Sequence, residues 1–128
     1  MWHRAVIERL RQSDVFAEVG LIGAKVRASV SDTMFLDIHY YPTTGSYSYS
    51  LIDLTLPYPG DKRVFGWDDY PHESVPAIRQ LRSHPHHFQR RSVTGEWLFE
   101  ESDMGGDVEC EINVVAGTVQ RYLTRLKA

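Results

Sequence analysis

The 128-residue chain has little cysteine, no long apolar segment and little net charge, and each shortage excludes a class of protein. Its single cysteine, Cys110, can form neither an intramolecular disulfide nor a four-cysteine zinc site, so we expect a reducing, cytoplasmic location. No apolar run reaches the ~18 residues of a membrane span and none reads as a signal peptide, so no membrane partner is expected. A net charge of −3 argues against a protein whose whole surface binds nucleic acid.

Nucleotide-binding and hydrolase signatures are also missing, because the chain has no Walker loop, no Rossmann glycine pattern and no nucleophile elbow. Composition is that of an ordinary soluble domain, with 42% hydrophobic and 24% charged residues. A chain of this length buries enough surface to fold without covalent staples, so we expect one domain over residues 1–128.

The apolar periodicity predicts an α+β fold with a helix at each end. The first helix is expected over residues 2–12, and a longer one follows Asp107, a good N-cap. Apolar residues of the second helix recur at heptad-like spacing, and we expect this stripe to pack on a sheet. The stripe consists of Val108, Ile112, Val115, Val119, Tyr122 and Leu126.

Alternating residues between the helices predict an antiparallel sheet of four to five strands. The predicted strands cover residues 15–30 (with a turn or bulge at its glycines), 34–41, 47–56, 62–67 and 92–99. Alternation within residues 34–41 places Asp37 and His39 on the face opposite Leu36 and Ile38. Prolines disfavour a long regular element over residues 68–79.

The richest chemistry lies in residues 67–87, which hold four of the six histidines and two adjacent aspartates. Imidazole transfers protons near neutral pH and is also the commonest metal ligand. Three interpretations of this segment are open: a proton-transfer site, a metal site, and a set of exposed loop histidines.

In the proton-transfer interpretation, His72 and His86 exchange protons in RNA cleavage and need no cofactor, with His84 and His87 as alternatives to His86. Asp68 orients one imidazole. Neighbouring arginines bind phosphate and stabilise the transition state. These arginines are Arg79, Arg82 and Arg90, within an acid-free segment at residues 79–95 that precedes an acidic one at residues 96–111.

In the metal interpretation, the ligands come from His72, His84, His86, His87 and one of Asp68 and Asp69. No cysteine contributes, and no two histidines have the His-x3-His spacing of a helical metal site. His86 and His87 would point to opposite sides of an extended chain. Strand tyrosines, Tyr49 among them, could stack on RNA bases, although cross-strand and core packing is the more common role of tyrosine.

Four segments in this order resemble the TumE family of small toxins from bacterial and archaeal toxin–antitoxin systems. They are residues 34–38 (MFLDI), 47–51 (YSYSL), 67–72 (WDDYPH) and 84–88 (HPHHF), and the last two are the most specific. Ser48 stands where that family often has arginine, and Asp69 where it often has asparagine. The resemblance covers the organisation of residues 15–92.

The resemblance implies a toxin that a cognate antitoxin protein neutralises, and RNA is the commonest target of small toxins. We therefore expect an RNA-directed toxin, with a metal-independent endoribonuclease as the enzymatic form. The competing expectations are a non-enzymatic protein-interaction or defence-associated module and a His/Asp metal-binding protein.

Overall fold

The computed structural model describes residues 1–127, in which helices flank and cover a run of strands. In chain order the elements are α1 (Trp2–Arg11), β1 (Glu18–Ile22), β2 (Lys25–Ser29), β3 (Met34–Tyr41), β4 (Ser46–Asp53), β5 (Arg63–Asp68), α2 (Pro76–Arg79), β6 (His87–Arg91), β7 (Trp97–Glu100) and α3 (Val108–Lys127). The predicted α+β class, with a helix at each end, is confirmed.

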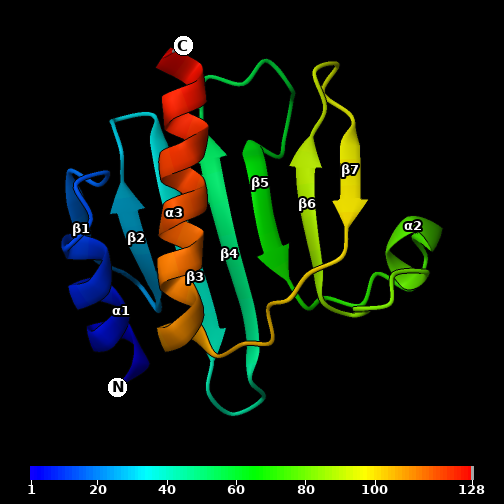
Figure 1. Cartoon of the computed structure of the whole chain (residues 1–128), viewed down its shortest axis with the longest axis horizontal. Coiled ribbons are helices and arrows are strands. Elements are labelled where there is room, and N and C mark those ends of the chain that lie inside the picture. Colours follow the sequence, from blue (N-terminus) through cyan, green and yellow to red (C-terminus); the bar gives the residue numbers. More distant parts are fainter. Residues whose placement is uncertain (128) are drawn as a thin grey trace.

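All strands join one seven-stranded antiparallel sheet, and each strand pairs with its neighbours in sequence. Figure 1 shows this meander from β1 on the left to β7 on the right. The antiparallel sheet is therefore confirmed, and the prediction of four to five strands is too low.

Two turns account for the additional strands. Residues 15–30 fold as the hairpin β1–β2 rather than as one strand, because Gly23 turns the chain with a φ of 62° that favours glycine. A second turn at residues 92–96 contains Gly95, with a φ of 88°, and separates β6 from β7. Most of the predicted strand over 92–99 is therefore a turn, with only residues 97–99 in β7, and the histidine segment that precedes it contributes the strand β6.

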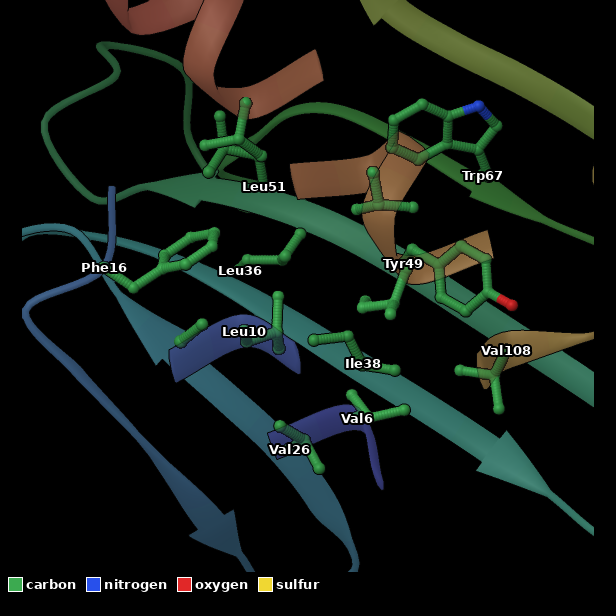
Figure 2. Packing of buried hydrophobic residues seen from close by; sticks show 14 of the residues in the cluster. Val6, Leu10, Phe16, Val26, Leu36, Ile38, Tyr49, Leu51, Trp67 and Val108 are labelled. Atoms are coloured by element: carbon green, nitrogen blue, oxygen red, sulfur yellow. The ribbon is translucent and has the colours of Figure 1, made fainter. Parts of the chain in front are cut away.

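Helices α1 and α3 lie side by side over one face of the sheet (Figure 1). The strand side chains beneath them alternate as predicted, with Leu36 and Ile38 of β3 opposite Leu51 and Tyr49 of β4. Figure 2 shows how these residues pack with Val6 and Leu10 of α1 and Val108 of α3, among others. Burial of this apolar area, at roughly 25 cal/mol per Å², stabilises the fold.

The apolar stripe of α3 packs on the sheet for most of its length. Val108, Ile112, Val115 and Val119 are buried, and Tyr122 packs against the core from a partly buried position. Leu126 is 57% exposed, so its predicted place against the sheet is wrong. Helical periodicity continues to the end of α3, but contact with the core does not.

Among residues 1–127, no long helix covers the opposite face of the sheet, which is rich in polar side chains; we call it the open face. Asp37 lies there as predicted and accepts hydrogen bonds from Arg27 (2.8 Å) and Lys25 (2.9 Å) of β2. Within residues 1–127, no helix combines the length and apolar character that a membrane crossing requires.

Candidate functional site

The candidate site lies on the open face, where β5 ends and β6 begins. Asp68 is the last residue of β5, and the register of the two strands pairs it directly with His87, the first residue of β6. Residues paired in this way point their side chains to the same face of the sheet. An imidazole and a carboxylate therefore meet inside the fold.

His87 is completely buried, and each of its ring nitrogens faces oxygen atoms. Nδ1 lies 3.1 Å from the carbonyl oxygen of Pro85, and Nε2 lies 3.1 Å from Oε1 of the buried Gln89. Nε2 is also 3.4 Å from Oδ1 of Asp68. Since a carbonyl oxygen only accepts hydrogen bonds, Nδ1 must carry the proton and donate it to Pro85.

His72 reaches the same point from the loop after β5. Its ring lies edge-on to that of His87, with 5.2 Å between ring centroids. Its backbone φ is 43°, and among residues 1–127 it is the one residue other than glycine with a positive φ. Such conformations cost of order 1–3 kcal/mol and cluster at functional sites.

Burial lowers the pKa of the His72 imidazole below its ordinary value. The negative charge of Asp68 works in the opposite direction, and the proximity of His87 and Arg63 lowers the pKa further. The His72 ring therefore favours its neutral form, in which one nitrogen has a free lone pair.

The carboxylate of Asp68 is held on both sides. Its Oδ1 accepts the backbone N–H of Tyr70 at 2.9 Å, and its Oδ2 lies 3.6 Å from Nη1 of Arg63. One donor atom from each of Asp68, His72 and His87 lies within 4.8 Å of the other two. We refer to these three residues as the Asp–His–His centre.

A strip of cationic and aromatic side chains continues from this centre along the open face. Arg63 lies over the ring of Trp97 at 5.4 Å, and Arg91 lies over the same ring at 3.8 Å and over Tyr58 at 4.6 Å. Arginine and a half-buried aromatic ring together suit a phosphate next to a stacked base.

The structure separates the predicted His72–His86 pair and brings His72 to His87 instead. His86 points to the helix-covered side, where its Nδ1 lies 2.8 Å from the hydroxyl of the buried Tyr47. Successive residues of an extended chain point to opposite faces, which is why His86 and His87 part. His84 lies beside the loop, with Nε2 2.9 Å from the carbonyl oxygen of Pro71.

The predicted phosphate-binding arginines do not line the centre. Arg79 ends α2, where Nη1 lies 3.4 Å from the carbonyl oxygen of Glu73, and Arg82 follows in an exposed turn. Arg90 forms an ion pair with Glu100 on the face opposite His87. The guanidinium that does reach the centre belongs to Arg63.

Tyr49, predicted to bind substrate, is completely buried beneath the helices and donates a hydrogen bond to Oε1 of Glu111 at 2.8 Å. Tyr49 is therefore a core residue and lies outside the candidate site. Burial, together with this bond and the charge of Glu111, raises the pKa of its hydroxyl.

Sequence reasoning missed two contributors, Arg63 and Gln89, and did not select His87 over His86. The signal for His87 was present, since a strand starting at residue 87 and paired with the end of β5 places it beside Asp68. Arg63 left no such signal, because a bulge in β5 near Val64 decides its direction.

Comparison of this chain with models of protein families, with curated proteins and with solved structures gave no match. Function is therefore inferred from the Asp–His–His centre and from the two segments that form it. Residues 67–72 and 84–88 contain all three residues of the centre.

Proposed function

We propose that this protein is the toxin of a toxin–antitoxin pair, that it acts on RNA, and that the Asp–His–His centre is where it reacts. The observation that carries the proposal is the convergence of the buried Asp68 and His87 with the partly buried His72 at one point of the open face. The two segments that most resemble the TumE toxins, residues 67–72 and 84–88, are the ones that meet there.

The surroundings of the centre fit a single-stranded RNA substrate. Arg63 would hold a phosphate close to Asp68 and His72, while the ring of Trp97 would stack on a base further along the strip. Arg63 also supplies a guanidinium in place of the arginine that the TumE toxins often have at the position of Ser48. Ser48 pairs directly with Asp68 across β4 and β5, so an arginine at residue 48 would start beside the carboxylate that Arg63 reaches.

Induced expression tests the proposal. Expression of the wild-type chain should slow growth and cleave cellular RNA, whereas His72→Gln should relieve both effects, since loss of a reacting imidazole costs roughly 10²- to 10⁴-fold in rate. His3→Gln, a histidine change in α1, is the matched control and should remain toxic. Co-expression of the adjacent gene, as candidate antitoxin, should restore growth.

His86→Gln separates this site from the proton-transfer pair expected from sequence. If toxicity depends on His86 and not on His87, the Asp–His–His centre is not the reacting site. A folded, well-expressed wild-type protein that leaves growth and RNA unchanged would remove the toxin proposal and leave a protein-interaction module.

A further inference from the structure

We propose that Asp68, His72 and His87 bind a first-row divalent transition-metal ion such as Zn²⁺. The proposal concerns the centre described above, and its consequence for catalysis rests on the proposed function. Metal binding itself can be measured without RNA, so the two proposals can fail separately.

Two side-chain oxygen atoms lie close to Nε2 of the buried His87. Because the Nδ1–H of His87 donates to the carbonyl oxygen of Pro85, Nε2 is the ring nitrogen that can bind a metal ion. Nε2 lies at hydrogen-bond distance, 3.1 Å, from Oε1 of Gln89 and 3.4 Å from Oδ1 of Asp68. A proton or a metal ion on Nε2 would satisfy these oxygen atoms.

The distance between His87 and Asp68 fits a shared metal ion. A charge-assisted N–H···O hydrogen bond is ~2.7–2.9 Å long, shorter than the 3.4 Å between Nε2 of His87 and Oδ1 of Asp68. Two donors bound tetrahedrally to one ion by bonds of ~2.1 Å lie about 3.4 Å apart. The His87–Asp68 spacing is therefore that of two ligands of a shared ion.

His72 supplies the third ligand. Because the donor atoms of the three residues lie within 4.8 Å of one another, bringing them to tetrahedral spacing needs a movement of about 1.5 Å. His72 is only partly buried and sits on a loop, so it can make this adjustment. Because His72 is partly exposed to solvent, water or a phosphate oxygen can take the fourth coordination position of the ion.

Surrounding hydrogen bonds orient the ligands as metal sites require. Metal-binding histidines commonly donate their second ring N–H to a backbone carbonyl, as His87 does to Pro85. Oδ1 of Asp68 is fixed by the N–H of Tyr70 and its Oδ2 lies near Arg63. Bonds of this kind keep the donor atoms aimed at one point.

The donor set selects the class of metal. Two imidazoles and one carboxylate suit Zn²⁺ and its first-row neighbours, whereas Mg²⁺ and Ca²⁺ prefer sites built of oxygen atoms. An ion with three protein ligands and one open position is a Lewis acid that can polarise a bound phosphate. That chemistry suits the RNA-directed function proposed above.

Calorimetry with the full chain, stripped of metal by a chelator and titrated with ZnCl₂, tests the proposal. We expect about one ion per chain, with affinity lowered at least about tenfold by His72→Gln and by Asp68→Asn. His3→Gln keeps the histidine count of His72→Gln while leaving the centre intact, so it should bind as the wild type does. Mg²⁺ should bind far more weakly than Zn²⁺.

Nuclear magnetic resonance of the wild-type imidazole nitrogens gives a readout that does not depend on whether a variant folds. Zn²⁺ should shift the Nε2 resonance of His87 and one resonance of His72, with Nδ1 of His87 still protonated. Absence of Zn²⁺ binding, equal binding by His72→Gln and wild type, or a proton that stays on Nε2 of His87 in excess Zn²⁺ would each overturn the proposal. RNA cleavage that persists in chelator would overturn its catalytic consequence and leave the proposed function standing.

Discussion

The imidazole of His87 and the carboxylate of Asp68 face each other across β5 and β6, with Nε2 3.4 Å from Oδ1. Strand register alone creates this relationship. A slip of one residue would place Phe88 opposite Asp68 and turn His87 toward the helix-covered face. The aromatic contacts of Phe88 with Phe65 and Trp67 therefore help to hold the centre together, although they lie on the other side of the sheet.

His72→Gly should make the protein more stable and inactive. The φ of 43° at His72 strains any residue with a side chain, whereas glycine adopts it readily. We therefore expect the free energy of unfolding of His72→Gly to exceed that of the wild type by about 1 kcal/mol. Urea denaturation measures this change, and the growth assay measures the loss of toxicity. His72→Ala is the control, because it removes the imidazole but keeps the strain. Equal stability of the two variants would argue that the backbone at this position is unstrained.

Arg63→Gln should weaken RNA binding roughly tenfold or more, since hydrogen bonds to charged groups contribute about 1.5–3 kcal/mol. Arg90→Gln should have a smaller effect, because Arg90 lies on the other face of the sheet. Fluorescence anisotropy with a single-stranded RNA gives both affinities. Arg4→Gln, in α1, corrects for the change in net charge. A larger loss for Arg90→Gln would move RNA to the helix-covered side.

Gly66→Ala should destabilise the fold by about 1–3 kcal/mol. A Cβ at residue 66 would lie 2.7 Å from the backbone carbonyl oxygen of Tyr49 and 3.0 Å from the hydroxyl of Ser50, so strand β4 must shift. Gly20→Ala in β1, where a Cβ meets nothing within 4 Å, is the matched control and should cost little. Thermal denaturation compares the two, and equal melting temperatures would contradict the close approach of β4 and β5.

Asp37 should make stability depend on pH in the acid range. Burial by itself would raise the pKa of its carboxyl, but the hydrogen bonds and charges of Arg27 and Lys25 outweigh burial and hold it below the ordinary value of 3.8. A lowered pKa in the folded state contributes stability above the ordinary value, and this contribution is lost as pH falls from there through the folded value.

Denaturation of Asp37→Asn between pH 3 and 7 measures that contribution by difference. The wild type should lose stability more steeply than the variant below about pH 4. Asp32→Asn, in the exposed turn between β2 and β3, should follow the wild-type curve. Parallel curves for the wild type and Asp37→Asn would show that the contacts with Arg27 and Lys25 do not favour the ionised carboxylate.

Tyr49→Phe tests whether this tyrosine acts only in the core. Loss of its hydroxyl leaves Oε1 of Glu111 without one partner and should cost about 1 kcal/mol of stability. Toxicity and RNA affinity should stay unchanged, because the ring is buried away from the open face. A fall in RNA affinity without a fall in stability would restore Tyr49 to the binding site.

Local patterns in the sequence determined the main elements and their faces. Alternation in residues 34–41 assigned Leu36 and Ile38 to the core and Asp37 to the opposite face, because side-chain direction in a strand repeats every two residues. The same rule assigned His86 and His87 to opposite sides. The density of histidine and aspartate in residues 67–87 located the segment that holds the Asp–His–His centre.

Only the tertiary structure decided which of these side chains meet. The partnership of His87 with Asp68 depends on the register of β6 against β5, and register depends on aromatic packing between strands that are 19 residues apart at this pair. The position of Arg63 depends on a bulge, and the end of core contact before Leu126 depends on where the sheet lies beneath α3. Periodicity describes the direction of a side chain within its own element, whereas contacts between elements depend on how the whole core packs.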